Sequence, residues 1–368
     1  MKTIRRLIHR EVFFSVVFVT VAFLGLFAFF DFVDQLSSIG RPHMPGYQVP
    51  QAALYVALLV PSHLYELLPI TVLIGTIYVM TRLAQSSEFT ILRTSGLGPW
   101  RALRMLLSAG FTFALLTFVI GDYLTPWADR NAQLLKARYQ GNITVGQTGA
   151  WLREREAYAQ YGVNVGSLAP DGTLRNVRIF EFDNQSALVS LTQAPVARFS
   201  GDDAWELIEA ERTEFIHPPG AESRVERTRV PVFRWPNGIS AEMISAAVLK
   251  PDRMSALDLF QYIRHLKANA QTAERYEIEF WKKVFYPLSC LVMVMMALPF
   301  AYLHFRNEGI SLYVFGGVMA GISFFFLNNM FAYIGELRHW VPWITAAAPG
   351  MLFMFISLAA FGWLVLRR

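Results

Sequence analysis

The sequence has a single cysteine, Cys290, and it lies inside an apolar run. A disulfide within the chain is therefore impossible, and a cysteine-rich metal site is excluded. Charged residues are also scarce, at 17% of the 368 residues. No glycine is followed directly by lysine, so the sequence lacks the phosphate-binding loop in which backbone amides and that lysine hold a nucleotide. If nucleotide drives this protein, it acts through another polypeptide.

Apolar residues, in contrast, make up 54% of the chain, and phenylalanine is abundant. A soluble protein of this size would leave too much apolar surface in water, so lipid is the expected solvent for much of the chain. A bilayer core about 30 Å thick requires about 20 apolar residues of helix. Six stretches meet or approach that length, near residues 12–33, 60–82, 99–122, 283–303, 309–332 and 342–366. The first is too long for a signal-peptide core and is predicted to be a retained membrane anchor.

Basic residues flank these stretches on alternate sides. One set contains Lys2, Arg5, Arg6, Arg10, Arg82, Arg93, Arg101, Arg104, Arg306, Arg367 and Arg368, whereas the opposite short loops hold only Arg41 and Arg338. Because short loops rich in lysine and arginine stay in the cytoplasm, we expect both termini to be cytoplasmic. Six spans, an even number, satisfy this requirement.

About 160 residues of different character lie between the third and fourth spans. Short alternating runs occur there at 175–183, 187–200, 204–216 and 224–235, with turn residues between them. Val177 and Ile179 would share one face of a strand, as would Trp205 and Leu207. This pattern predicts an all-β sandwich or jelly roll, which the topology places outside the cytoplasm. From about Ser255 to Trp281 the pattern becomes helical.

The predicted fold is therefore a polytopic α-helical membrane protein with six transmembrane helices and an inserted all-β periplasmic jelly-roll domain. Transmembrane helices 1–3 occupy residues 1–122. The jelly-roll domain and a connecting helix occupy 123–281, and transmembrane helices 4–6 occupy 282–368.

The loop LAQSSEFTILRTSGLGPW, at 83–100, is predicted to contain a short helix at about 86–96. Ser86 or Ser87 would cap it, and Glu88 in the first turn complements the helix dipole. Arg93 suits the last turn, and Gly96 is expected to end the helix in a left-handed conformation. A proline then opens the third span at a first-turn position.

Phe89, Ile91 and Leu92 of this short helix would be exposed unless something covers them. Two interpretations stay open at this point. The helix rests on lipid headgroups as an interfacial segment, or it acts as a coupling helix seated in a groove of a cytoplasmic partner.

Several segments resemble the LptF/LptG permease family across essentially the whole chain. The main ones are YELLPITVLIG (65–75) and LAQSSEFTILRTSG (83–96). Others are FVDQL (32–36), IGDYLTP (120–126), RYEIEFWKKVFYPLS (275–289) and GISFFF (321–326). FVDQL is closer to one of the two branches of this family than to the other.

This resemblance implies a membrane subunit of the lipopolysaccharide exporter in the inner membrane of Gram-negative bacteria. The expected partners are a permease of the other branch, two copies of the ATPase LptB, and the single-span protein LptC. Lipopolysaccharide would enter a cavity between the two permeases, and ATP-driven closure would push it upward into the jelly rolls. We expect no cofactor, catalytic residue or metal site in this chain, since ATP and magnesium are used by the partner ATPase.

The resemblance also implies site residues. The predicted ATPase-coupling set is Ser87, Glu88, Phe89, Leu92, Arg93 and Gly96, with Glu88 and Arg93 contacting LptB. The predicted lipopolysaccharide path contains Phe27, Phe30, Leu67, Arg130, Lys136, Arg138, Phe324 and Phe326. Lipid-facing phenylalanine and a solvated charge run are the ordinary alternatives for this second set. Asp31 and Asp34 are a departure, because relatives often place basic residues just after the first span.

A chain of this composition has three rival functions. An enzyme that modifies the lipid would need convergent catalytic groups in the outer domain, which has no cysteine and a single histidine, His217, before the returning helix. A lipoprotein-release permease carries four spans rather than six. The paralogous branch of the same family shares the fold, partners and cargo.

Overall fold

The structure is a computed structural model. It describes residues 2–41, 44, 46–86, 88–94, 96–140, 143–144, 150–155, 159–169, 172–183, 187–200, 204–216, 224–236, 251–269, 271–302 and 310–363. The chain divides into two compact units. Unit 1 contains residues 1–37, 56–129 and 274–368, and unit 2 contains residues 38–55 and 130–273. The domain boundaries predicted at 122 and 281 stay a prediction.

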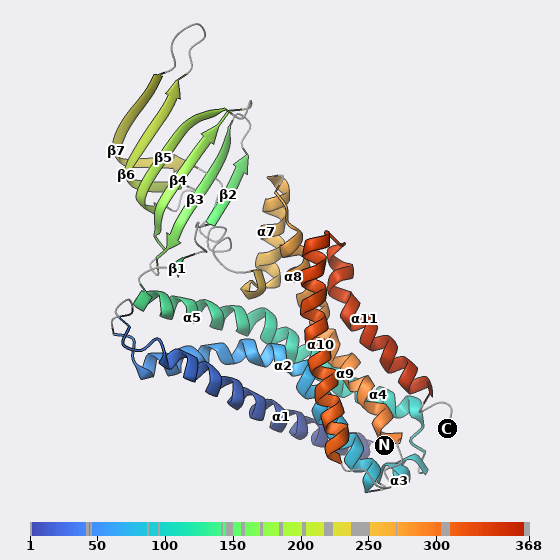
Figure 1. Ribbon diagram of the computed structural model, residues 1–368. Helices are drawn as coiled ribbons and strands as arrows, with labels where there is room; N and C mark the ends of the chain where they lie inside the picture. The colour runs from blue at the N-terminus through green and yellow to red at the C-terminus, as the bar shows by residue number, and fades with distance from the viewer. Residues whose placement is uncertain are drawn as a thin grey trace. The chain divides into compact units, whose positions relative to one another are not determined.

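Helices dominate unit 1 (Figure 1). In chain order the helical elements that lie wholly or partly in it are α1 (Lys2–Leu36), α2 (Val49–Gln85), α3 (Glu88–Thr94), α4 (Pro99–Val119), the π-turn η1 (Ile120–Leu124), α5 (Thr125–Gln140), α8 (Glu274–Phe285), the 3-10 turn η3 (Tyr286–Leu288), α9 (Ser289–Ala297), the 3-10 turn η4 (Leu298–Tyr302), α10 (Ile310–Arg338) and α11 (Pro342–Phe361). The first turns of α2 and most of α5 belong to unit 2.

In the part of the chain that the structure describes, six helical stretches are long and apolar enough to cross a membrane. They are Arg5–Leu36, Val49–Gln85, Pro99–Lys136, Glu274–Tyr302, Ser311–Arg338 and Pro342–Phe361. The predicted polytopic helical fold with an inserted β domain is confirmed. The second helix begins earlier than predicted, and the fourth includes the polar turns after Glu274. Hydropathy detects the lipid-immersed part of a helix, whereas the helix itself continues into the polar interface.

Helix α9 lies at the centre of unit 1. It is apolar on every side, as expected of a helix buried on all sides, and it packs against α4 and α11. Helices α1 and α2 approach so closely that a Cβ atom added to Gly75 would lie 2.8 Å from the backbone nitrogen of Val16. Small residues permit this kind of backbone contact between membrane helices. Gly75 is therefore a packing position of the α1–α2 pair.

Unit 2 contains an antiparallel β-sheet (Figure 1). Its described strands are β1 (Ile143–Thr144), β2 (Ala150–Arg155), β3 (Gln160–Leu168), β4 (Leu174–Phe182), β5 (Leu188–Phe199), β6 (Ala204–Ile216) and β7 (Arg224–Pro236). Strands β3 to β7 pair in chain order as a meander, and both β1 and β2 pair with β3. The described strands form one sheet, so the two-sheet arrangement of a jelly roll stays a prediction.

The inward face of this sheet forms its own apolar core. Val177 and Ile179 are buried on β4, and Trp205 and Leu207 are buried on β6, as the alternation predicted. Trp205 lies opposite Trp235 of β7 in the register. Alternating burial is the period of two that a half-buried strand requires, so the four predicted runs are confirmed as strands β4 to β7.

The predicted helical segment near 255–281 consists of two helices. Helix α7 (Ala256–Ala268) in unit 2 begins with a capping box, in which the Ser255 side chain accepts from the Asp258 amide. Helix α8 begins at Glu274 in unit 1. Burial of His265 on α7 lowers the pKa of its imidazole, because the charged form loses hydration there.

Candidate functional site

The short helix predicted between the second and third spans is present as α3. Glu88 lies in its first turn and Arg93 in its last turn. Gly96 has a φ of +97°, and the amide of Leu97 donates to the Leu92 carbonyl at 3.1 Å, which closes the helix C-terminus. The helix is shorter than the predicted 86–96, and Ser87 lies outside the described residues. The local sequence signals therefore predicted this element correctly.

One face of α3 packs into the core of unit 1. Phe89 is 3% exposed, and its ring meets the Tyr302 ring edge-on at a centroid distance of 5.0 Å. The guanidinium carbon of Arg93 lies 5.8 Å from the centroid of the same tyrosine ring. Aromatic pairs and cation–π contacts of this kind each contribute about 0.5–1.5 kcal/mol beyond area burial. Tyr302 thus attaches α3 to η4 at the end of the fourth span.

The other face of α3 points outward. Glu88, Ile91, Arg93 and Thr94 are exposed, and Ile91 is 63% exposed. The sequence left open whether Phe89, Ile91 and Leu92 are all uncovered. The chain itself covers Phe89 and partly covers Leu92, which leaves Ile91 as the apolar residue of the outer face. This face combines both charge signs with one apolar side chain.

Short connections link α3 to three further helices. Arg82, at the end of α2, forms an ion pair with Glu11 of α1. After α3, Arg101 of α4 donates to the Gly96 carbonyl at 3.3 Å. Because the connecting segments are only a few residues long, a displacement of α3 must be shared by α2, α4 and, through Arg82, α1. These contacts join α3 to the ends of its neighbouring helices.

The apolar residues of the predicted lipid path do not converge. Phe27, Phe30 and Phe326 are exposed on α1 and α10. Leu67 of α2 and Phe324 of α10 are instead buried in the helical core. Phe324 packs edge-on against Phe353 at 5.2 Å. Exposed and buried members of this set can therefore contact one ligand only if the helices rearrange or a second chain completes the path.

The three predicted basic residues all lie on α5. Arg130 and Arg138 are exposed, while Lys136 is half-buried with its ammonium 5.1 Å from the centroid of the Tyr55 ring. A lysine held over an aromatic face still has N–H groups to donate. Arg130 and Arg138 are more accessible to an anionic group than Lys136 is.

Local sequence patterns do not indicate which residues pair with the acids at the end of the first span. Asp31 is paired with His63 of α2, with 2.6 Å between Oδ2 and Nε2. Ser62, which directly precedes His63 on α2, donates to the buried Asp129 at 2.7 Å. The two residues of each pair lie on adjacent spans and are about 30 to 70 positions apart in the sequence. Local patterns therefore do not predict these pairs. Asp31 thus joins α1 to α2 through His63.

No group of three or more histidine, cysteine or acidic side chains is placed to hold a metal ion, as far as the described residues extend. Unit 2 has a cavity of about 350 Å³ that the sequence did not indicate. Trp151 and Tyr161 line it from β2 and β3, together with Phe182 and the amides of Gln160 and Gln271. An aromatic lining with a few polar groups suits an apolar chain such as an acyl tail.

Comparison with known proteins gives one consistent result. The sequence profile of the family described as lipopolysaccharide export system permease LptF/LptG matches residues 6–366. The lipopolysaccharide export system permease protein LptG of Escherichia coli strain K12 is 26% identical over 366 residues, which cover 99% of this chain and 98% of that protein. The protein of the same name from Haemophilus influenzae is 25% identical over 370 residues, with 100% and 99% coverage.

Proposed function

This chain belongs to the LptF/LptG family of lipopolysaccharide export permeases, and from that premise we propose that it is the LptG-type subunit of an exporter that extracts lipopolysaccharide from the inner membrane. The similarity to two LptG proteins over nearly their whole length supports this branch rather than the paralogous LptF. Six candidate spans, rather than four, disfavour a lipoprotein-release permease.

The proposed assembly pairs this chain with LptF in the membrane, with two copies of LptB beneath them and LptC joining from one side. Both termini face the cytoplasm in this arrangement, and unit 2 lies in the periplasm, as the distribution of basic residues favours. ATP and magnesium are bound and used by LptB. The role of this chain is mechanical, and we assign it no catalytic residue.

The single observation that carries the coupling part of this proposal is the two-sided packing of α3. Its inner face is anchored through Phe89 to Tyr302, and its outer face presents Glu88, Ile91 and Arg93. A helix that only rested on lipid headgroups would not require the Phe89–Tyr302 contact to the end of the fourth span. An ATPase that pushes this outer face would move the cytoplasmic ends of α2 and α4 together.

Closure of the helices would then make the lipid less stable in the cavity between the two permeases. The exposed residues Phe27, Phe30 and Phe326 supply an apolar wall for acyl chains. Arg130 and Arg138 lie on α5, where the anionic headgroup would pass, and charge-assisted hydrogen bonds from arginine suit its phosphates. The lipid would leave toward the β-sheet of unit 2.

The test compares the purified LptB–LptF–LptG complex with and without Glu88→Ala in this chain. ATP turnover and lipopolysaccharide release from vesicles are measured in parallel. We expect both rates to fall by about tenfold or more, because loss of a charged hydrogen-bonding contact costs roughly 1.5–3 kcal/mol. The complex itself should still assemble, since Glu88 is exposed.

The matched control is Glu226→Ala, which removes a half-buried acid on β7 that pairs with Arg224 on the same strand. It should leave both rates unchanged. Equal rates in the Glu88→Ala complex and the unaltered complex would contradict the coupling role and leave α3 as an interfacial helix.

A further inference from the structure

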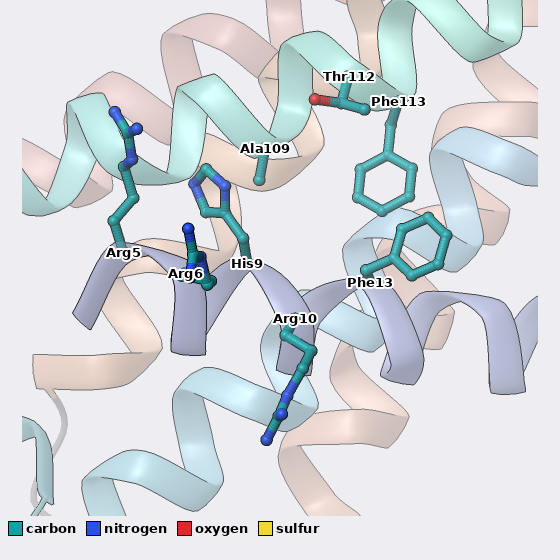
Figure 2. A pocket seen from close by; sticks show the side chains of 8 residues that line it. All are labelled: Arg5, Arg6, His9, Arg10, Phe13, Ala109, Thr112 and Phe113. Atoms are coloured by element: carbon teal, nitrogen blue, oxygen red, sulfur yellow. The ribbon is translucent and has the colours of Figure 1, made fainter. Parts of the chain in front are cut away.

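A cavity of about 530 Å³ lies between the first turns of α1 and the middle of α4 (Figure 2). Its lining comes from Arg5, Arg6, His9, Arg10, Phe13, Ala109, Thr112 and Phe113. These residues play no part in the coupling face of α3 or in the proposed lipopolysaccharide path. A volume of this size falls in the range of small-molecule sites.

The cavity carries an excess of positive charge. Within the described residues, Arg5, Arg6 and Arg10 have no acidic partner within 4.0 Å. The acid that follows them on α1, Glu11, is already paired with Arg82 of α2. Three guanidinium groups at one helix end, without internal counter-charge, attract an anion to the entrance of the cavity.

Figure 2 shows that the side chains along this part of α1 do not all point the same way. Arg5 and His9 project toward α4, whereas the Arg10 guanidinium extends to the opposite side. Arg5 and Arg6 precede Arg10 and form the outer end of the lining along α1. They are the residues that an anion entering the cavity would meet.

The inner end of the cavity is apolar and aromatic. The rings of Phe13 and Phe113 stack at a centroid distance of 6.2 Å and an interplanar angle of 15°. Phe13 lies about 12 Å further along α1 than Arg5, at roughly 1.5 Å per residue. The cavity therefore changes from cationic to apolar over a distance comparable to the step from headgroup to acyl chain in a bilayer.

His9 holds the two walls together. Its Nε2 atom lies 2.9 Å from the Met105 carbonyl oxygen and 3.0 Å from the Ser108 hydroxyl oxygen, both on α4. Hydrogen bonds between membrane helices stabilise their packing. This link fixes α1 against α4 beside the cavity, so the site is formed before any ligand arrives.

We infer that this cavity binds an anionic phospholipid, with its phosphate at Arg5 and Arg6 and its proximal acyl chain against Phe13 and Phe113. Arginine binds phosphate through its planar fork, and basic residues next to a membrane span recognise anionic headgroups. A free phosphate would satisfy the arginines but leave the aromatic end unused. On the orientation proposed above, the lipid belongs to the cytoplasmic leaflet.

The experiment is native mass spectrometry of the full chain in a neutral detergent, titrated with phosphatidylglycerol. The key variant is Arg5→Gln with Arg6→Gln, and the matched control is Arg101→Gln with Arg104→Gln. The control removes two exposed charges from the first turns of α4 that do not line the cavity. We expect the key variant to bind phosphatidylglycerol about tenfold more weakly, at roughly a tenfold change per 1.4 kcal/mol. The control should change binding by less than about twofold.

Phosphatidylcholine, which has no net charge, should bind unaltered protein much more weakly than phosphatidylglycerol. Phe13→Ala should weaken phosphatidylglycerol binding without folding defects, since this ring is half-exposed. Equal losses in the two double variants would show general surface attraction and overturn the proposal. Displacement of the lipid by inorganic phosphate at equal concentration would also overturn it, because the ligand would then be the free anion.

Discussion

Helices α2 and α10 are both long and apolar, yet they occupy opposite environments. In the most apolar 18-residue stretch of α2, 83% of the residues are buried within the chain, whereas in the corresponding stretch of α10 the share is 17%. The exposed surface of α10 includes Phe315 and Phe326, and the buried surface of α2 includes Leu73 and Ile77. Composition alone does not separate these two helices.

The difference shows that an apolar residue in a membrane helix can face either the lipid or the protein interior. Lipid tails are as apolar as leucine, so burial within the protein gains little hydrophobic free energy in a bilayer. What distinguishes an inner helix is close backbone packing, as at Gly75. An outer helix such as α10 is free to face lipid or a partner chain.

The largest effect is expected from Gly75→Leu. The added Cβ would lie within 3 Å of the Val16 backbone, which has no rotamer by which to move away. We expect separation of α1 from α2 and loss of monodisperse protein by size-exclusion chromatography, since overpacking against backbone costs more than the usual 1–3 kcal/mol.

The matched control is Gly316→Leu on α10, where an added Cβ meets no atom within 4 Å in the described chain. The isolated chain should tolerate it. Recovery of well-folded Gly75→Leu protein would contradict the inner–outer distinction. If Gly316→Leu blocked pairing with the second permease but not folding, the outer face of α10 would be identified as an interface.

The next largest effect is a difference in stability between substitutions on the two faces of α3. Phe89→Ala should destabilise the chain by about 3 kcal/mol, because it removes a buried ring and its contact with Tyr302. Ile91→Ala should change stability by less than about 0.5 kcal/mol, because the side chain is exposed. Thermal unfolding in detergent measures both. Similar losses for the two variants would show that α3 is covered on both faces within this chain.

A smaller effect is expected from His63→Ala. It leaves Asp31 half-buried without its 2.6 Å partner and should cost about 1–2 kcal/mol. The control Asp34→Asn changes an exposed neighbour on the same helix and should cost less than about 0.5 kcal/mol. Equal unfolding temperatures for His63→Ala and the unaltered chain would show that the pair contributes nothing to the α1–α2 contact.

The smallest effect is a pH dependence at the turn between α10 and α11. His339 Nδ1 lies 2.5 Å from Glu274 Oε2, and this hydrogen bond and the carboxylate charge raise the pKa of His339 above its ordinary 6.5. The ion pair is therefore complete below pH 6.5 and is lost as the pH rises through the raised pKa. Fluorescence of the adjacent Trp340 should report a titration above pH 6.5. His339→Gln should abolish it, and a persistent titration would assign the signal to another group.

Local patterns predicted a large part of this structure. Strands β4 to β7 begin and end within one or two residues of the predicted runs, because period-two alternation and turn residues are encoded locally. The presence of α3 and the left-handed glycine after it were predictable for a similar reason, since both depend on neighbouring residues. The extent of α2 and of the fourth span was less predictable, because polar helical turns carry no hydropathy signal.

Local sequence patterns predicted less of the candidate site. That Phe89 faces inward and Ile91 outward depends on Tyr302, a residue more than 200 positions away. Leu67 and Phe324 were expected along a lipid path, yet they lie in the helical core of this chain. The α1–α4 cavity is lined by basic residues and by two aromatic rings from different spans. In the sequence, the basic residues indicated only the orientation of the spans.

The sequence by itself determined the six spans, the inserted β-strands, the short helix between the second and third spans, and the family resemblance. Each rests on periodicity, capping or motif signals that extend over a few residues. The tertiary structure decided which apolar residues face inward and which acids find partners, as with Asp31 and His63 or with Lys283 and the Gly121 carbonyl at 3.0 Å. Those outcomes depend on contacts between residues tens to hundreds of positions apart. Hydrophobicity does not predict them, because lipid and the protein interior are similarly apolar surroundings for a helix.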